Sequence, residues 1–209
     1  MRQKFFDHRT FVQFDEAKAV GFRFLFGVDE AGRGPLAGPV VASAVWVKDT
    51  GFTTRIADSK LLNESQREQA FTEIQDRALV GVGIIDETVI DAINILRATH
   101  QAMALAVHDL SARMFFPAKD VKVIIDGNSY RGAIPFTHEC VVKGDAQSMA
   151  IACASIVAKV TRDRIMDDYD RMYPVYGFKA HKGYPTRAHR DAVKAFGFSP
   201  IHRKTFRIR

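Results

Sequence analysis

Two short apolar runs, residues 24–28 and 121–125, are each followed at once by an aspartate, Asp29 or Asp126. Runs of this length with few polar residues are typical of strands that are buried on both faces, as in α/β proteins. If the two strands are parallel neighbours, their carboxyl ends share one edge of the sheet. Ligand sites in α/β sheets form at such edges, so this spacing predicts an active site there.

A third acid, Asp145, ends a short apolar run that begins at Val141 and precedes an alanine-rich stretch, so we expect it at the end of a strand and at the amino end of a helix. Aspartate is also a favoured helix N-cap, and the helix dipole stabilises it there whether or not it binds anything. Asp126 could likewise only open a turn, and Asp29 could be an ordinary polar residue at a strand end. Each acid taken singly therefore has a purely structural interpretation.

Three carboxylates at one sheet edge repel one another unless a proton or a cation lies between them. We favour a cation, and a ligand set made only of oxygens selects hard ions such as Mg²⁺ or Mn²⁺ over zinc. The cysteines and histidines do not have the spacing of a zinc site. Because successive strand residues point to opposite faces, Glu30 can share an ion with Asp29 only if the strand ends or bulges there, or through its main-chain oxygen.

The segment around Arg33 reads GVDEAGRGPLAGPV over residues 27–40. Its glycines do not match a dinucleotide fingerprint, because Pro35 intervenes and a strand-like run follows where a phosphate-binding helix would begin. No serine lies in a G-x-S-x-G elbow, and neither Cys140 nor Cys153 has an adjacent base. We interpret these cysteines as small buried hydrophobes, one on a strand and one on a helix, in a reducing cytosol.

Hydrophobic periodicity predicts further elements, in this order: a strand at 40–47, a helix at 63–78, a strand at 79–85, helical structure over 87–116, and one long helix or a pair over 146–172. Within the first helix, Phe71 and Ile74 should face inward. The stretch 87–116 would contain two helices that meet near Arg97. The last helical region is rich in small residues, which allow close packing against a sheet.

Basic residues are concentrated in the last third of the chain. The net charge is +6, and residues 143–209 hold 14 lysines and arginines against 6 acids, which leaves 16 against 18 for residues 1–142. Such asymmetry suits a surface that follows phosphates, with a merely solubilising surface as the alternative. With 47% hydrophobic and 26% charged residues and without a long apolar span, we expect a cytoplasmic globular protein.

Six blocks lie in order along nearly the whole chain: GVDEAGRGPLAGPV at 27–40, ADSKLL at 57–62, IIDGN at 124–128, KGDAQSMAIACASIVAKVTRDRIM at 143–166, YGFKAHKGYPTRAH at 176–189 and HRKTF at 202–206. Together they resemble the bacterial ribonuclease HII family, the type 2 ribonucleases H. One short motif could match by coincidence, but six collinear ones make a specific signal.

The resemblance implies an α/β, ribonuclease H-like fold, in which helices flank a mixed five-stranded sheet. It implies a single catalytic domain over residues 1–209, of which roughly 165–209 form a helical, substrate-binding carboxyl-terminal extension. Two divalent ions, Mg²⁺ or Mn²⁺, would activate water and stabilise the leaving 3′-oxygen. The resemblance assigns catalysis and metal binding to four acids: Asp29, Glu30, Asp126 and Asp145.

The family hydrolyses the RNA strand of RNA–DNA hybrids and nicks duplex DNA 5′ to an embedded ribonucleotide, leaving 3′-hydroxyl and 5′-phosphate ends. This implies a monomer that acts in ribonucleotide and RNA primer removal. Among the alternatives, a ribonuclease HIII typically has lysine at the position of Arg33, and a junction resolvase or transposase would lack the glycine-arginine-glycine segment. A non-catalytic hybrid-binding protein is the alternative from another class, and retention of all four acids argues against it.

The resemblance also implies substrate contacts. The backbone of Gly32, Arg33 and Gly34 would contact the 2′-hydroxyl at the cleavage position, since bare glycines allow close approach. Tyr184 would pack on the deoxyribose after the ribonucleotide, although by itself it reads as a half-buried loop aromatic. Thr186 is expected to cap the final helix. Three residues would contact substrate phosphates, although a lone lysine is usually only solvated: Lys60, Ser155 and Lys159.

Overall fold

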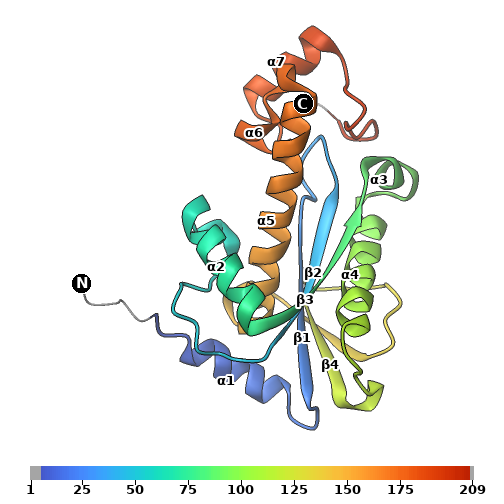
Figure 1. The fold of residues 1–209 in the computed structure, drawn as a ribbon. Coiled ribbons are helices and arrows are strands. Elements are labelled where there is room, and N and C mark those ends of the chain that lie inside the picture. Colours follow the sequence, from blue (N-terminus) through green and yellow to red (C-terminus); the bar gives the residue numbers. More distant parts are fainter. Residues whose placement is uncertain (1–5, 208–209) are drawn as a thin grey trace, which may run out of the picture.

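A mixed five-stranded sheet forms the centre of the protein, in a computed structural model that describes residues 6–207 (Figure 1). Across the sheet the strands are β3 (Ala78–Ile85), β2 (Val40–Val47), β1 (Phe24–Ala31), β4 (Val121–Asp126) and β5 (Thr137–Val141). The first three are antiparallel neighbours, whereas β1, β4 and β5 are parallel. The predicted ribonuclease H-like arrangement of strands and the parallel pairing of β1 with β4 are thereby confirmed.

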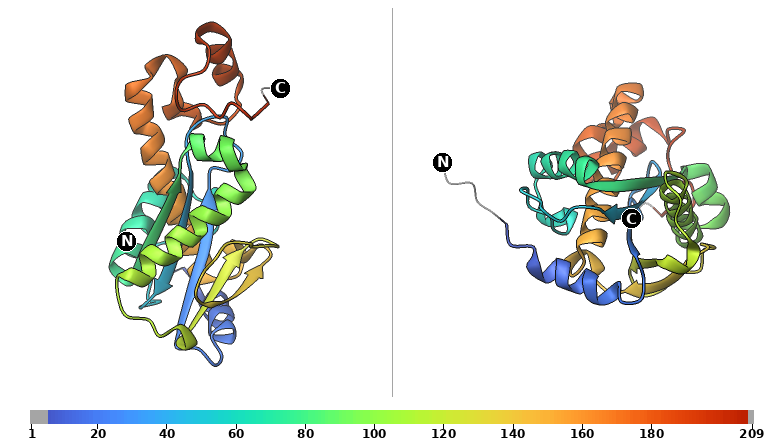
Figure 2. Two further views of the ribbon diagram at one scale, coloured as in Figure 1. Left: turned by 90° about the vertical axis from the view of Figure 1, so that its right-hand side faces the viewer. Right: turned by 60° about the horizontal axis from the view of Figure 1, so that its bottom comes forward.

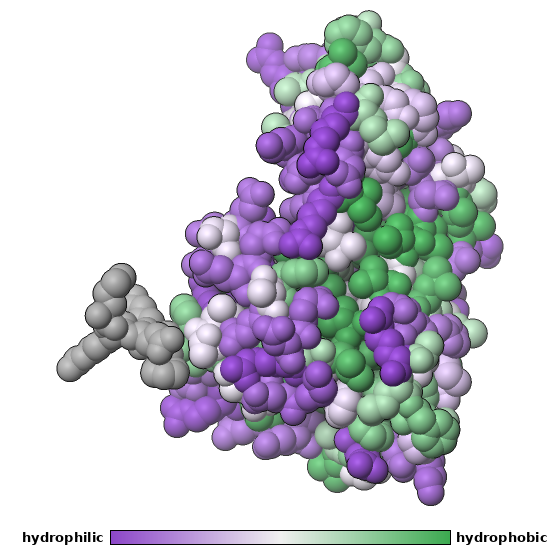
Figure 3. Space-filling model, in the orientation of Figure 1, coloured by the Kyte–Doolittle hydropathy of each residue, from purple (hydrophilic) through white to green (hydrophobic). Residues whose placement is uncertain are grey.

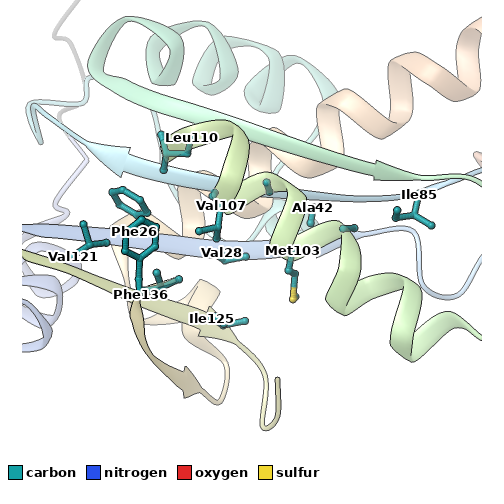
Figure 4. Packing of buried hydrophobic residues seen from close by; sticks show 14 of the residues in the cluster. Phe26, Val28, Ala42, Ile85, Met103, Val107, Leu110, Val121, Ile125 and Phe136 are labelled. Carbon is teal, nitrogen blue, oxygen red and sulfur yellow. The ribbon is translucent and has the colours of Figure 1, made fainter. Parts of the chain in front are cut away.

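The central strand β1 is apolar because both of its faces are covered. Phe24, Phe26 and Val28 face α4 (Ile95–Ala112) and belong to the cluster drawn in Figure 4, where side chains of α4 pack on those of β1, β2, β3 and β4. Leu25 and Gly27 face the opposite side, toward α5 (Met149–Met172). Helices on both faces remove the strand from water, so a continuous apolar run is stable there.

The helix α5 lies very close to β1. A Cβ atom added at Gly27 would stand 2.2 Å from the carbonyl carbon of Ala150 and 2.4 Å from the nitrogen of Ile151, both in the backbone of α5. Alanines, Cys153 and Ser155 on the buried face of α5 allow this approach. On the same side of the sheet lie α1 (Arg9–Lys18) and α2 (Glu64–Arg77), as Figure 2 shows.

Beyond the sheet, α5 continues into a carboxyl-terminal group of helices, α6 (Phe178–His181) and α7 (Arg187–Phe196), at the top of Figure 1. The Thr186 side chain accepts a hydrogen bond from the His189 N–H at 3.2 Å and caps α7, as predicted. In Figure 3 this upper region is mixed, with hydrophilic residues along α5 and hydrophobic ones at its top. Four 3₁₀ turns complete the described part of the chain: η1 (Ser59–Leu61), η2 (Ala118–Asp120), η3 (Gly144–Ala146) and η4 (Pro174–Tyr176).

Two predicted helix boundaries were wrong. The helical stretch divides into α3 (Glu87–Ile93) and α4 at Asn94, not near Arg97, because Asn94 adopts a left-handed φ of 69° and its side chain accepts hydrogen bonds from the first turn of α4. The long helical region is a single helix that begins at Met149, three residues later than expected. The predicted start of the extension, near residue 165, lies inside this helix.

The buried face of α2 and the burial of the two cysteines were also predicted from the sequence. In α2, Ile74 is fully buried and Phe71 is partly buried, so the predicted inward face is confirmed. Cys153 is buried on α5, whereas Cys140 on β5 is only partly buried, and both are free thiols. No described helix is long and apolar enough to cross a membrane.

Replacement of Gly27 by alanine should push α5 away from β1. We expect a loss of about 1 to 3 kcal/mol in the free energy of unfolding, the range for overpacking a well-packed core, measured by denaturant titration. Gly34→Ala is the matched control, since a Cβ there meets only Tyr184 Cε1 at 3.7 Å. Equal stability of the Gly27→Ala variant and the natural chain would contradict the close contact.

Candidate active site

Three aspartates from distant parts of the chain meet at one edge of the sheet. Asp29, Asp126 and Asp145 each offer a carboxylate oxygen, and these oxygens lie within 4.8 Å of one another. The parallel register pairs Val28 with Ile125, which brings the next residue of each strand to the same level. The predicted convergence of the three acids is therefore present in the structure.

The alternation of side chains along the strands explains which acids meet. Val121, Val123 and Ile125 of β4 belong to the cluster under α4, so Asp126 projects to the opposite face, the face of Asp29. Regular pairing with β2 continues through Glu30 to Ala31, without a bulge. Glu30 consequently points to the α4 side, where its carboxylate lies 3.3 Å from the Arg33 guanidinium.

Asp145 reaches the site from a turn and not from a strand end, which corrects the sequence-based expectation. The strand β5 ends at Val141, and Asp145 lies in η3 after Lys143, whose backbone is left-handed. The turn is attached to the other acids, because the Gly144 N–H donates to Asp126 Oδ1 at 2.7 Å. The interpretation of Asp145 as a helix N-cap was also wrong, since the side chain of Ser148 caps α5.

Burial and like charge raise the pKa values of Asp29 and Asp145. Asp29 is 5% exposed, and burial, followed by the charges of Glu30 and Asp126, raises its pKa well above the usual value. Hydrogen bonds from the Ser155 hydroxyl and the Glu30 N–H act in the opposite direction. Burial and then the charge of Asp126 also raise the pKa of Asp145.

A divalent cation fits this set of donors. The three aspartates offer only carboxylate oxygens, and their mutual repulsion is relieved when a positive charge lies between them. The neighbouring cation is Lys60, whose Nζ lies 4.0 Å from Asp145 Oδ2 and 3.9 Å from Asp58 Oδ1. Its side chain is 80% exposed, so its charge is mostly screened by water and does not neutralise the buried cluster.

A small cleft of about 50 Å³ opens beside Asp126 on the α4 side of the sheet. Glu30, Arg33, His100 and Asn128 contribute to its walls. Of the glycine-arginine-glycine segment, Arg33 thus lines a cleft together with Glu30 and Asp126. Tyr184 lies at the far end of the same segment, 3.7 Å from the place that a Cβ of Gly34 would take, and it is 41% exposed.

The other two predicted phosphate contacts are less accessible than Lys60. Ser155 is 3% exposed, and its hydroxyl lies 3.0 Å from that of Ser59. Lys159 is partly buried and forms an ion pair with Asp163 at 2.6 Å. Both residues lie on the face of α5 that turns toward the sheet or α2, and their predicted contact with substrate is not tested by these positions.

Sequence reasoning missed a set of buried polar residues behind the glycine segment. Arg162 and Arg203 are each only 1% exposed and donate to main-chain carbonyls. Both occur in the blocks that carry the resemblance, which was the one available signal. Their burial could not be predicted, because arginine is almost always exposed when no acid pairs with it.

Histidines form a second buried network, under the loop that carries Tyr184. The Ser199 N–H donates to Nδ1 of His202 at 2.9 Å, so Nδ1 carries no proton and Nε2 donates to Nε2 of His189 at 3.0 Å. Nδ1 of His189 in turn donates to the Tyr184 carbonyl at 2.9 Å. This chain of hydrogen bonds requires both imidazoles to be neutral.

Another hollow, of about 650 Å³, lies between α2 and the loop after β2. Among the acids that line it, Glu73 already accepts hydrogen bonds from Thr53, Thr54 and Arg77. Because Glu73 is already held by these residues, whereas the three aspartates repel one another unless a cation lies between them, we place the active site at the aspartates.

The mixed sheet, with carboxylates gathered at the edge shared by β1 and β4, defines the class of the protein: a ribonuclease H-like nuclease with an acidic metal-binding site. The family model for ribonuclease HII matches residues 26–208. This chain belongs to the ribonuclease HII family. It is therefore a hydrolytic endonuclease that cleaves the RNA of RNA–DNA hybrids.

Relatives and solved structures agree with this assignment. A ribonuclease HII of Acetivibrio thermocellus is 50% identical over 192 residues, which cover 91% of this chain and 72% of the relative. That of Syntrophus aciditrophicus is 49% identical over 195 residues, covering 93% and 89%. The ribonuclease H2 structure from Pyrococcus horikoshii has a TM-score of 0.71 at 27% identity, covering 88% of this chain and 94% of that one.

A structure of Bst ribonuclease HIII in complex with Mn²⁺ also superposes, with a TM-score of 0.71, covering 91% of this chain and 69% of that one. At 19% identity this likeness concerns the fold alone. The acids and the glycine segment were expected from the sequence, and the fold is the one that the resemblance implied.

Neutralising Asp29 should stabilise the protein when no metal is bound. In chelator, Asp29→Asn removes a buried charge that its neighbours repel, and we expect the free energy of unfolding to rise by roughly 1 kcal/mol. Added Mn²⁺ should raise the melting temperature of the natural chain but hardly that of the variant. Asp168→Asn, an exposed acid on α5, is the control, and an Asp29→Asn variant that is less stable in chelator would contradict this account.

The buried histidines should make the protein sensitive to acid. Burial, followed by the charge of His189, lowers the pKa of His202 to about 4, from 6.5. Because the folded state disfavours protonation of His202, the neutral imidazole contributes stability. This contribution is complete above pH 6.5 and is lost as the pH falls toward 4. His202→Gln should reduce that loss in denaturant titrations, whereas the exposed His108→Gln should leave it unchanged. An identical pH profile for His202→Gln would rule out this histidine.

Proposed function

We propose that this ribonuclease H cuts at embedded ribonucleotides as well as within hybrids, nicking the strand 5′ to the ribonucleotide and leaving 3′-hydroxyl and 5′-phosphate ends. The observation that carries the proposal is the meeting of Asp29, Asp126 and Asp145 at the end of β1, the strand that leads directly into Gly32–Gly34. A site of this kind places carboxylates that bind cations next to a backbone segment that can contact a sugar hydroxyl. Both are needed to select and hydrolyse a ribonucleotide.

Asp29, Asp126 and Asp145 would hold two divalent ions, Mg²⁺ or Mn²⁺, with Glu30 as the fourth acid. Glu30 lies on the other side of β1, so we propose that it acts through its main-chain oxygen or after release from Arg33. When bound, the ions would supply the positive charge that an attacking water and a leaving 3′-oxygen require. The presence of Mn²⁺ in the similar fold of Bst ribonuclease HIII supports the choice of ion.

Recognition of the sugar would come from the glycine segment and Tyr184. The N–H groups of Gly32–Gly34 would contact the 2′-hydroxyl at the scissile position. Tyr184, exposed beside Gly34, would then pack on the following deoxyribose, one sugar farther along the strand. Aromatic rings are suited to this task, since they present a large apolar face at little entropic cost.

The duplex would be gripped by the basic carboxyl-terminal region, from about residue 165 onward, within a single catalytic domain. Lys60 is exposed beside the acids and would contact a substrate phosphate. The same role for Ser155 and Lys159 stays a prediction, because their polar atoms are already engaged. We further propose that the enzyme acts as a monomer in the cytoplasm, where its two free thiols stay reduced.

A hybrid-binding protein without activity is the remaining alternative. Binding to a polyanion is favoured by cations and opposed by acids. A pure binding protein would gain nothing from three like charges that are partly or fully buried at the centre of its presumed binding surface. This arrangement favours catalysis over binding alone.

A cleavage assay tests the proposal. A DNA duplex with one ribonucleotide is incubated with enzyme in Mg²⁺, Mn²⁺ or chelator, and the product ends are mapped. We expect a single nick 5′ to the ribonucleotide, dependent on metal, and a loss of at least about a hundredfold in kcat for Asp126→Asn, since the variant lacks a carboxylate for the ions. Asp76→Asn, at an exposed position on α2 outside the carboxyl-terminal region, should keep full activity. Undiminished cleavage by Asp126→Asn would refute the metal role of this acid.

A further inference from the structure

Arg203 gathers the carbonyl groups of the glycine segment from a position about 170 residues away along the chain. Its guanidinium donates to the carbonyls of five residues, at distances of 2.6 to 3.2 Å: Gly32, Arg33, Pro35, Gly38 and Pro39. Arginine has five N–H hydrogens in a rigid fork, and here each has an acceptor. The segment therefore folds around this one side chain.

No acid forms an ion pair with Arg203. Within residues 6–207, no carboxylate lies at ion-pair distance from its guanidinium, which is only 1% exposed, although the more distant charges of Glu87 and Asp91 act on it. A buried charge without an ion-pair partner is costly, and the carbonyl dipoles supply direct hydrogen bonds that water would otherwise give. Lysine could not replace it, because an ammonium has three donors and no planar fork.

The geometry of the peptide group determines where the N–H groups of this segment point. In a trans peptide the N–H points opposite to the C=O of the same plane, and the described chain contains no cis peptide. When the carbonyls of Gly32 and Arg33 point at Arg203, the N–H groups of Arg33 and Gly34 point away from it. Neither N–H has an acceptor within the described part of the protein.

We propose that Arg203 is a positioning residue for ribose recognition: it fixes the N–H groups of Arg33 and Gly34 so that they meet the 2′-hydroxyl of the scissile nucleotide. The inference rests on the proposed function, in which the glycine segment reads that hydroxyl. It adds that the preference for ribose over deoxyribose is set by a side chain that touches no substrate.

Arg162 is the natural comparison. It is equally buried and also donates only to carbonyls, those of Ala37, Pro39 and Lys182. None of these belongs to the two peptide groups whose N–H points away from Arg203. Loss of Arg162 should consequently weaken the fold without redirecting those N–H groups, whereas loss of Arg203 should do both.

The test measures binding by full-length protein that carries Asp126→Asn, in chelator, so that the duplex stays intact. Dissociation constants are determined for a DNA duplex with one ribonucleotide and for the all-DNA duplex of the same sequence. We expect Arg203→Lys to reduce the ratio of the two affinities about tenfold, the effect of one misplaced hydrogen bond. Affinity for the all-DNA duplex should stay within a factor of about two, and Arg162→Lys should keep the ratio.

The outcomes separate the two claims. If the protein with Arg203 intact binds both duplexes equally, the proposed reading of the 2′-hydroxyl by the glycine segment fails, and the role of Arg203 fails with it. If the preference exists and survives Arg203→Lys, or falls equally with Arg162→Lys, only the role of Arg203 is overturned. A parallel loss of affinity for both duplexes would indicate a merely structural role and would also overturn it.

A second measurement needs no change at Arg203, in case that variant does not fold. In the Asp126→Asn protein, the amide resonances of Arg33 and Gly34 should shift when the ribonucleotide-bearing duplex replaces the all-DNA duplex. The amide of Leu36, which donates to the Gly183 carbonyl at 2.8 Å, should respond much less. Unchanged resonances of Arg33 and Gly34 would overturn the proposal.

Discussion

The close packing of α5 against β1 is the constraint on which the rest of the structure depends. Because Gly27 has no side chain, the first turns of α5 touch the backbone of the central strand directly. That contact places Ser155 under Asp29 and brings the turn that precedes α5, with Asp145, against the end of β4. Farther along the same helix, Arg162 reaches the carbonyls behind the glycine segment. One helix thus organises both the acids and the loop beside them.

Unpaired buried charge occurs twice in this region, with opposite sign. The aspartates repel one another where cations are needed. Within the described residues, Arg162 and Arg203 form no ion pair and donate to carbonyls, beside a loop whose N–H groups would face a ligand. Neither arrangement is favourable for folding by itself. Both arrangements are explained by preorganisation for binding. Metal ions would bring the positive charge that the aspartates need, and the nucleic acid would bring the group that hydrogen-bonds to the exposed N–H groups.

Much of this could be predicted from the sequence, because burial on both faces gives β1 and β4 an unbroken apolar pattern, and parallel pairing then brings Asp29 and Asp126 together. The position of Asp145 could not be predicted in this way, because it depends on a turn whose conformation is fixed by contact with Asp126. The helix break at Asn94 needed a left-handed residue that periodicity does not reveal. Arg203 reads as one more charge in a basic tail, because its carbonyl acceptors come together only in the folded chain.

The most direct test of the central claim, that three remote aspartates create a site for divalent cations, is a crystal structure with Mn²⁺, in which anomalous scattering locates the ion. The account predicts a strong peak coordinated by carboxylate oxygens of Asp29 and of at least one of Asp126 and Asp145. A protein saturated with Mn²⁺ whose anomalous peaks all lie away from these side chains would contradict it.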